Sequence, residues 1–344
     1  MALPSSLPVP RTPDPREAPA LRWGILGTGW IAAQFTTALQ EHTSQQVVAV
    51  GSRSQESADG FAHRFGIGRA HASYDALVAD RDVDVVYVAT PHNHHYPDAL
   101  RAIHAGKHVL IEKPIALNAV QARHIAAEAQ EHGVMAMEAL WTFFLPKFDV
   151  VRQLLESGVL GQIHTVLADH GQFFEGDHRI LRTDLAGGPM LDLMTYPASF
   201  ANWVLGAPTD VVARTTWAPS GVTGQTAIML SHGEAAQSLL HSSVQSRTPT
   251  TAAICGSEAM LFFDPDFYIP GDFTLSDNDG HELRFTEAHV AHTGGLHFQA
   301  ADMARRIAAG ERTSVIRPLE DSIATMEIMD EARRQIGEVY AEER

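Results

Sequence analysis

Short apolar runs alternate with helical patterns from Leu21 to about Leu140. The runs that indicate buried strands are Trp23–Leu26, Val47–Ser52, Val85–Ala89, Val109–Glu112 and Val134–Glu138. Residues that suit helix ends lie between them, namely Pro97 in a first turn, Gly106 after a last turn, and Asn118 and Gly133 at the two ends of the following helix. This alternation predicts a parallel, doubly wound sheet that binds ligands outside the carboxyl ends of its strands.

After Pro146 the pattern changes. A helix is expected at Phe148–Leu155, and strands are expected within Ile163–Phe174, Val211–Trp217, Thr226–Leu230, Ala236–Val244 and Ala252–Phe263. Two helical patterns, Leu296–Ala309 and Leu319–Ile336, follow. The predicted fold class is therefore α/β plus α+β, with a Rossmann domain followed by an open, mainly antiparallel sheet.

The expected domains are a flexible, proline-rich tail at 1–20, a dinucleotide-binding domain at 21–141 and a substrate-binding and oligomerisation domain at 142–344. Packing of the last helices against the first domain is left open.

The composition restricts the partners. The formal charge of −16 argues against nucleic acid and anionic membranes, which attract clustered Lys and Arg. The N-terminal segment lacks the cationic start and long apolar core of a secretory signal, and a location in the cytoplasm is expected. Cys255 is the single cysteine, so no intrachain disulfide can form, and a buried, inert thiol is expected.

The glycines after the first predicted strand carry the clearest chemistry. Gly27, Gly29 and Ala32 have G-x-G-x-x-A spacing between a strand and a helix, which is the context of a dinucleotide-binding turn. Gly27 would permit the tight turn, and Gly29 would let the backbone approach a pyrophosphate at the helix N-terminus. Thr28, Trp30 and Ile31 share this turn and are expected to contact the cofactor.

The end of the second predicted strand indicates which cofactor is used. NAD-binding folds usually place an acidic residue there, but this chain has Ser52-Arg53-Ser54. The guanidinium fork of Arg53 suits a 2′-phosphate, so NADP is favoured and NAD is the second choice. The alternative is that Arg53 is a solvated loop cation.

Two further segments carry candidate catalytic groups. Glu112-Lys113-Pro114 ends a predicted core strand, where an ammonium can reach a reacting oxygen, although such a lysine is ordinarily a surface cation.

The second segment, Gly187–Pro197, places Asp192 and Tyr196 four residues apart, on one helical face, with a kink expected at Pro197. Its glycines are expected to permit close approach to a ligand. The alternative to a catalytic role is that Asp192 stabilises a helix end and that Tyr196 belongs to the core.

These residues resemble a known family over most of the chain. GTGWIA, ATPHNHHYPDAL at Ala89–Leu100, AGKHVLIEKP at Ala105–Pro114 and GGPMLDLMTYP are similar to motifs of the glucose–fructose oxidoreductase/inositol dehydrogenase/MocA-type oxidoreductases. EALWTFFLP at Glu138–Pro146 and the Tyr196–Pro197 pair resemble the branch of dimeric dihydrodiol dehydrogenases and NADP-dependent aldose (D-xylose) dehydrogenases. Met194 and Pro189 depart from the family pattern, which bears on the substrate more than on the cofactor.

The resemblance implies roles for individual residues. Lys113 would be the catalytic lysine, Tyr196 the acid–base residue and Asp192 a group that holds substrate or base, and the Lys113–Pro114 peptide would be cis. The resemblance also implies a homodimer formed through the C-terminal sheet. The remaining cofactor contacts are expected from Thr90, Pro91, His92, Asn93, His95 and Glu112, and substrate contacts from Trp141, His178 and Arg179, with His170 and Arg182 as further candidates to line the substrate pocket.

The expected function is that of an NADP-dependent oxidoreductase acting on a carbinol carbon of a sugar, polyol or cyclic trans-diol. Two alternatives remain: a non-catalytic nucleotide-binding regulator on the same fold, and a sugar dismutase with tightly bound cofactor. His92, His94 and His95 raise the question of a metal. None is expected there, because hydride transfer needs none and the run lies on the predicted nicotinamide path.

Overall fold

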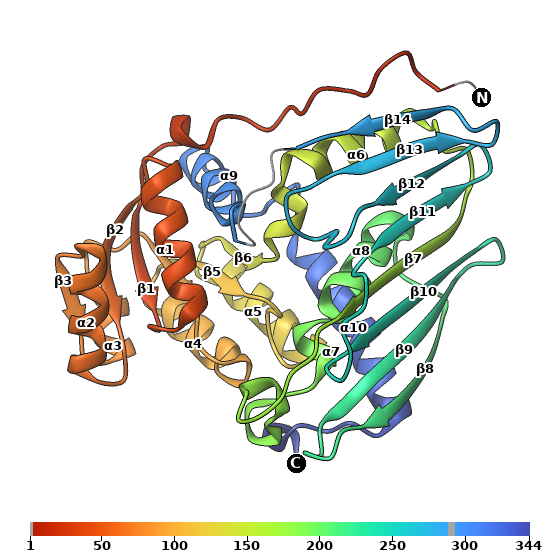
Figure 1. Ribbon diagram of the computed structural model, residues 1–344. Coiled ribbons are helices and arrows are strands. Elements are labelled where there is room, and N and C mark those ends of the chain that lie inside the picture. Colours follow the sequence, from red (N-terminus) through yellow and green to blue (C-terminus); the bar gives the residue numbers. More distant parts are fainter. Residues whose placement is uncertain (1–2, 288–292) are drawn as a thin grey trace. The chain divides into compact units, whose positions relative to one another are not determined.

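The computed structural model describes residues 3–287 and 293–344 (Figure 1). It divides into two compact units, each described by itself. The parallel-sheet unit comprises Pro13–Phe144 and Ala291–Ser322, and the mixed-sheet unit comprises Met1–Thr12, Leu145–Val290 and Ile323–Arg344. Residues from the C-terminal part of the chain therefore belong to both units.

The parallel-sheet unit has six parallel strands in the order β3-β2-β1-β4-β5-β6. Its strands are β1 (Arg22–Leu26), β2 (Gln46–Gly51), β3 (Arg69–His71), β4 (Val85–Val88), β5 (His108–Glu112) and β6 (Ala136–Ala139). Its helices are α1 (Trp30–His42), α2 (Gln55–Phe65), α3 (Tyr74–Val78), α4 (His92–His104), α5 (Ala119–Glu131) and α9 (Leu296–Ala308), with short 3-10 turns η1 (Pro15–Glu17) and η2 (Trp141–Phe144). This strand order is that of a Rossmann fold and confirms the prediction.

The core of this sheet explains its sequence pattern. Every residue of β4 and β6 is buried, because helices cover both faces of a parallel sheet. Phe35 of α1 stacks on Tyr87 of β4 with ring centroids 3.9 Å apart. One predicted boundary was wrong: α4 begins at His92 and contains Pro97, since Pro91 precedes the helix as its N-cap. The elements β3, α2 and α3 were not predicted.

The mixed-sheet unit has eight strands in the order β14-β13-β12-β11-β7-β10-β9-β8, in which only the β7–β10 pair is parallel. The strands are β7 (Ile163–Gly171), β8 (Asp210–Trp217), β9 (Thr223–His232), β10 (Ala236–Ser243), β11 (Ala252–Gly256), β12 (Ala259–Phe263), β13 (Phe273–Asp277) and β14 (Glu282–Phe285). The helices are α6 (Pro146–Ser157), α7 (Pro189–Asp192), α8 (Thr195–Leu205) and α10 (Leu319–Ile336), which begins in the other unit, with turns η3 (Arg179–Leu181), η4 (Thr183–Leu185) and η5 (Ala341–Glu343).

The mainly antiparallel sheet was predicted, but two details differ. The run Ala252–Phe263 forms two strands, because Ser257 and Glu258 make a tight turn between β11 and β12. Strands β13 and β14 were not predicted. Cys255 is half-buried rather than buried, and its burial raises the pKa of the thiol.

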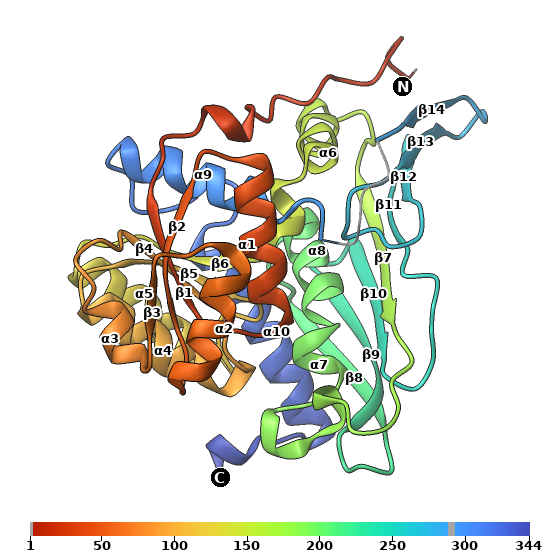
Figure 2. The same ribbon diagram turned by 60° about the vertical axis from the view of Figure 1, so that its left-hand side comes forward.

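Among the described residues of this unit, helices cover one face of the sheet, and the other face carries partly exposed apolar side chains. Burial alternates along β9, β10 and β12, so every second side chain points to each face. Helices α7 and α8 pack against β7, β9 and β10 on the covered face (Figure 2). Large apolar side chains stay partly exposed on the other face, namely Leu167, Met229, Leu239, Met260 and Phe262.

The proline-rich N-terminal segment was expected to be flexible, yet it makes specific contacts. Within the mixed-sheet unit, the Arg11 backbone N–H donates to Asp149 at 2.6 Å. Within the parallel-sheet unit, Ala18 is buried against Ala301 and Ala304 of α9. Residues 1–2 of the predicted tail lie outside the described residues.

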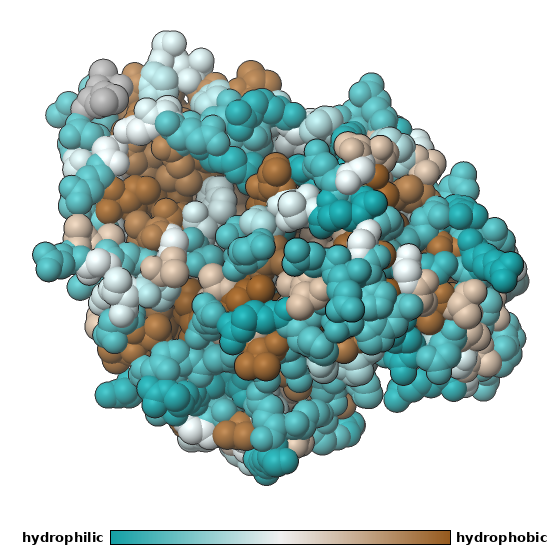
Figure 3. All heavy atoms as spheres, turned by 180° about the vertical axis from the view of Figure 1, so that it is seen from behind, coloured by the Kyte–Doolittle hydropathy of each residue, from teal (hydrophilic) through white to brown (hydrophobic). Residues whose placement is uncertain are grey.

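The side shown in Figure 3 is largely hydrophilic, with scattered hydrophobic patches. This agrees with an excess of Asp and Glu (41) over Lys and Arg (25). Among the described residues, no helix is both long and apolar enough to cross a membrane.

Candidate active site

The glycine turn after β1 has the geometry that a dinucleotide needs. Gly27 has φ +107°, and a side chain there would bring its Cβ to 2.7 Å from the carbonyl oxygen of Ala89 after β4. Gly29 is different, because a Cβ there would meet nothing within 4 Å. It is the N-cap of α1, and no side chain caps this helix. Gly27 thus allows the ends of β1 and β4 to approach each other, and Gly29 leaves space at the N-terminus of α1.

The end of β2 is followed by an exposed cation. Ser52 is buried, and its backbone N–H donates to the carbonyl of His71 at 3.1 Å. Ser54 caps α2 by accepting from the N–H of Ser57. Arg53 between them is exposed, and within residues 3–287 and 293–344 its side chain has neither a hydrogen-bond nor an ion-pair partner. Its guanidinium is therefore available for an anion.

Lys113 lies at the carboxyl end of β5, half-buried, on a tightly held backbone. Its N–H donates to Oε2 of Glu112 at 3.2 Å, and the hydroxyl of Tyr87 donates to Oε1 of the same carboxylate. The Lys113–Pro114 peptide is cis, as the resemblance implied. The backbone beneath the ammonium is thus fixed by buried groups.

A buried ion pair holds the next residue of this loop. The N–H of Ile115 donates to Oε1 of Glu138 at 3.0 Å. Oε2 of Glu138 accepts from Arg317 at 2.9 Å and from Ser322 at 2.7 Å. Glu138 and Arg317 are 1% and 2% exposed. Sequence reasoning missed both roles, since nothing local links Arg317 to β6.

His95 is the member of the histidine run that touches this loop. Its Nδ1 lies 2.7 Å from the carbonyl oxygen of Pro114, and its Nε2 lies 2.8 Å from that of Thr90. The buried ring thereby connects the end of β4 with the residue after Lys113. His92 is also buried and packs edge-on against His95, whereas His94 is exposed. Pro91 is exposed and Asn93 half-buried beside them.

Asp192 and Tyr196 lie in the mixed-sheet unit, and the predicted continuous helix was wrong there. Helix α7 ends at Asp192 and α8 begins at Thr195. The break falls at Leu193 and Met194, before Tyr196, while Pro197 lies in the first turn of α8, where proline is tolerated. The two residues therefore end one helix and begin the next rather than sharing a helical face.

The glycines before α7 pack closely against other parts of the chain. A Cβ at Gly187 would lie 2.5 Å from the carbonyl oxygen of Arg182 and 2.6 Å from that of Ile180. Gly188 has φ +105°. The chain's own backbone therefore requires a glycine at 187, and a Cβ at Gly188 would lie 2.9 Å from Oγ1 of Thr223.

Tyr196 belongs to a buried aromatic cluster under α8. Its ring centroid lies 4.4 Å from that of Tyr268 and 5.3 Å from that of His170. Burial raises the pKa of Tyr268 far above its usual value, and the negative charges of Tyr196, Asp266 and Asp192 add to this effect, so Tyr268 stays protonated. Sequence reasoning missed Tyr268, which is far from any motif in the chain.

The predicted substrate residues occupy different environments. Nη2 of Arg179 forms an ion pair with Asp192 at 2.9 Å, with the Arg179 side chain 49% exposed. His178 is exposed and caps η3. Trp141 is 4% exposed within η2 of the parallel-sheet unit. Arg182 pairs with Asp184 and not with Asp192.

These features fit a dinucleotide in the parallel-sheet unit. The 13-residue helix α1 has an uncapped N-terminus, Gly29 offers open space beside it, and the exposed guanidinium of Arg53 follows β2. A pyrophosphate and a 2′-phosphate are the chemical groups that such features bind.

Comparisons with known proteins agree with this geometry. Residues 21–140 match the model of an oxidoreductase family with an NAD-binding Rossmann fold, and residues 148–262 match the GFO/IDH/MocA C-terminal domain. Trans-1,2-dihydrobenzene-1,2-diol dehydrogenase of Danio rerio is 33% identical over 334 residues, with 94% of this chain and 99% of that protein covered. The Xenopus tropicalis enzyme of the same name is 31% identical over 331 residues, covering 93% of this chain and 99% of that protein.

Solved structures show the same fold. KijD10, a 3-ketoreductase from Actinomadura kijaniata solved with NADP and TDP-benzene, aligns with a TM-score of 0.82 at 27% identity, over 92% of this chain and 98% of that one. Levoglucosan dehydrogenase in complex with NADH and levoglucosan aligns with a TM-score of 0.84 at 19% identity, over 93% and 98% of the two chains, which supports the fold alone. The chain belongs to the GFO/IDH/MocA family of oxidoreductases and is a dehydrogenase or reductase acting on CH–OH groups of a sugar or diol.

Proposed function

We propose that this protein is an NADP-dependent oxidoreductase acting on a carbinol carbon of a sugar, a polyol or a cyclic trans-diol. The observation that carries the proposal is Lys113 at the carboxyl end of β5, with the backbone of residues 113–115 held by Glu112, His95 and Glu138. A lysine whose backbone is fixed at this edge of a Rossmann sheet suits stabilisation of a developing alkoxide. The diol dehydrogenases and the 3-ketoreductase named above support the substrate class.

In this proposal the bound nicotinamide supplies or accepts the hydride, and the chain manages the proton. Tyr196 in its phenolate form takes the hydroxyl proton of the substrate, and Lys113 stabilises the alkoxide that remains. Asp192, oriented by Arg179, accepts a hydrogen bond from a second substrate hydroxyl. Tyr268 stays protonated because burial raises its pKa, so it donates a hydrogen bond and does not act as the base.

The preference for NADP rests on Arg53. Among the described residues, the Arg53 guanidinium has no hydrogen-bond or ion-pair partner, which suits the 2′-phosphate, and Ser52-Arg53-Ser54 contains no acidic residue to accept from a ribose hydroxyl. Arg53→Asp is expected to lower kcat/KM for NADP by about 10-fold or more and to raise the relative use of NAD, because it removes the fork and adds a repelling charge. Equal efficiencies with both cofactors in the unmodified protein would contradict the preference.

The experiment that tests the function is a panel of aldoses, inositols and vicinal diols with NADP and NAD, followed by absorbance of the reduced cofactor. Turnover that is lost in Lys113→Met supports the proposal. Specific nucleotide binding without turnover of any panel member, in either direction, would instead favour a regulator. Mass spectrometry of the freshly purified native protein detects retained nucleotide, which is expected only of a dismutase with tightly bound cofactor.

We further propose a homodimer formed through the uncovered face of the mixed sheet. Leu167, Leu239 and Phe262 are 40%, 48% and 40% exposed there, and a hollow of about 520 Å³ lies on the same face. Contiguous apolar surface of this kind typically marks an interface. Leu239→Glu is expected to give monomers in analytical ultracentrifugation, whereas the control Val315→Glu, at another exposed apolar position, is expected to stay dimeric. A monomeric unmodified chain at micromolar concentration would refute this.

A cytoplasmic location is part of the proposal. The single cysteine allows no intrachain disulfide, which is typical of proteins from reducing compartments.

A further inference from the structure

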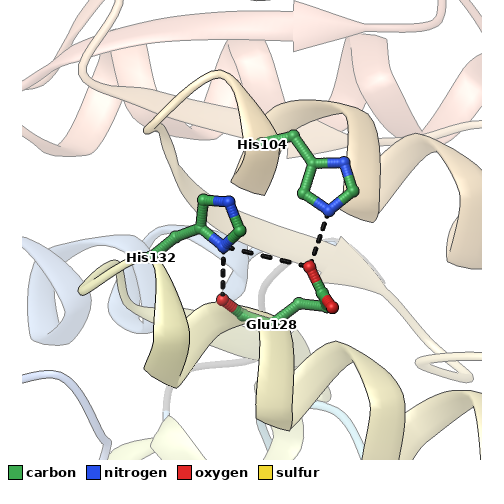
Figure 4. Close-up of side chains that lie close together, drawn as sticks. All are labelled: His104, Glu128 and His132. Carbon is green, nitrogen blue, oxygen red and sulfur yellow. Dashed lines mark hydrogen bonds and ion pairs between the residues drawn. The ribbon is translucent and has the colours of Figure 1, made fainter.

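A cluster of imidazoles surrounds one carboxylate on the outer side of α4 and α5 in the parallel-sheet unit. Nε2 of His104, the last residue of α4, lies 2.7 Å from Oε2 of Glu128 on α5. Nδ1 of His132, the C-cap of α5, lies 3.9 Å from the same oxygen. Figure 4 shows His104 and His132 directed toward Glu128 from two sides. One candidate ligand atom from each residue lies within 4.8 Å of the others.

We propose that His104, Glu128 and His132 bind a divalent transition-metal ion of the zinc class. Two imidazoles and a carboxylate are a donor set that Zn²⁺ prefers. Ligand atoms at about 2.0–2.1 Å from a tetrahedral ion lie roughly 3.3 Å apart, so the three groups need only small side-chain movements to surround one. In exchange, the ion takes the place of the hydrogen bonds that join these groups, including that of His132 Nδ1 to the carbonyl oxygen of Glu128.

The charge of Glu128 suits a cation. Imidazole nitrogens of His104, His124 and His132 lie 2.7, 3.3 and 3.9 Å from its carboxylate oxygens. Neutral imidazoles and a carboxylate each offer a lone pair, so together they form a ligand set for a cation.

A fourth side chain adds an independent argument. Nε2 of His124 lies 3.3 Å from Oε1 of Glu128, and its Nδ1 lies 2.7 Å from the hydroxyl of Tyr96 on α4. With an ion bound, Nδ1 would keep its proton toward the tyrosine hydroxyl, and Nε2 would offer its lone pair to the ion beside Glu128. Metal-binding histidines usually have such a partner on their other nitrogen. Spacing by four residues puts His124, Glu128 and His132 on one face of the helix.

The position of the cluster indicates a structural role. His104 ends α4 about 18 Å along the helix from His92, whose neighbour His95 holds the Lys113 loop. An ion at the far end would join the C-terminal ends of α4 and α5 without touching the cofactor or substrate residues. It would therefore stabilise the fold of this unit and leave the chemistry unchanged, an inference that does not depend on the proposed substrate.

The test uses the untagged full-length chain, freed of metal by a chelator. Calorimetric titration with Zn²⁺ is expected to show a single ion per chain, and Co²⁺ is expected to give the visible absorption of tetrahedral coordination. Zn²⁺ at about 100 times its dissociation constant is expected to raise the Tm by several degrees, because it binds the folded state alone. Several weak, equivalent ions per chain, or no binding, would overturn the proposal.

Variants assign the site. His104→Gln and His132→Gln are each expected to weaken Zn²⁺ binding about 10- to 100-fold or more and to abolish the rise in Tm, since each removes a ligand. His63→Gln is the matched control, an exposed helical histidine of the same unit. It is expected to bind Zn²⁺ as the unmodified chain does. Binding that is equal in all four proteins would place the ion elsewhere and overturn the assignment.

Discussion

The two sets of candidate catalytic residues are held in different ways. In the parallel-sheet unit, the backbone on either side of Lys113 is fastened by buried polar groups, among them Glu112, His95 and Glu138. In the mixed-sheet unit, Tyr196 is held by ring packing, and Asp192 by an ion pair with the half-exposed Arg179. Buried hydrogen bonds fix the orientation of the groups that they join, whereas ring packing and exposed ion pairs let a side chain change its orientation. The backbone around Lys113, on the cofactor side, is thus held more firmly than Asp192 and Tyr196, on the substrate side.

The largest effects are expected from the reacting groups themselves. Lys113→Met and Tyr196→Phe should each lower kcat by about 10²-fold or more, in the range for lost alkoxide stabilisation or proton transfer, with little change in NADP affinity. If the two residues act as one unit, the double variant loses much less than the product of the single losses. Steady-state kinetics and fluorescence titration with NADPH measure both quantities.

Near-normal kcat in Tyr196→Phe would remove Tyr196 from the acid–base role and leave Lys113 or a histidine of the 92–95 run as the candidate. Multiplicative losses in the double variant would show that the two sites act independently.

The sequence predicted the cofactor side better than the substrate side. The glycine turn and the Lys113 loop follow strands directly, so strand order alone brings Gly27, Thr90 and Lys113 to one sheet edge. The break at Leu193 and Met194 was hidden, because a continuous helical pattern does not reveal where backbone bonding stops. Tyr268 and Arg317 could not be predicted, since tertiary packing alone gives them their partners.

The next largest effect tests whether the cofactor side depends on its buried ion pair. Glu138→Gln should lower the free energy of unfolding by about 3–5 kcal/mol, because it leaves Arg317 charged and poorly paired in the core. Urea denaturation measures this, and Glu56→Gln on the exposed face of α2 is the control.

The double variant Glu138→Met with Arg317→Met separates stability from positioning. It should recover much of the lost stability, since a buried pair can be replaced by apolar groups. Its kcat should nevertheless lie below that of the unmodified chain, because the N–H of Ile115 lacks its acceptor. Recovery of kcat together with stability would show that Glu138 has no positioning role.

Acid should weaken the parallel-sheet unit through His297 on α9. Burial lowers the pKa of this side chain to about 4, and the charges of His42 and Arg16 lower it further. The unfolded chain takes up this proton near pH 6.5 while the folded chain does not, so stability is lost as the pH falls from about 6.5 to 4, by up to about 3 kcal/mol. Urea titrations of His297→Phe at pH 7 and 4.5 should show a smaller loss than the unmodified chain. An equal loss would assign the acid sensitivity to other groups.

The smallest effect on activity is expected from the exposed ion pair between Arg179 and Asp192. Arg179→Gln removes an ion pair whose arginine is 49% exposed, so stability should change by less than about 1 kcal/mol. Substrate KM should rise a few-fold, because Asp192 loses the partner that orients it, and kcat should change less. The control is Arg334→Gln, which breaks an exposed pair with Glu331 on α10 and should leave KM unchanged. A fall in kcat as large as that of Lys113→Met would mean that Asp192 is held as rigidly as the lysine loop, and the contrast between the two sides would disappear.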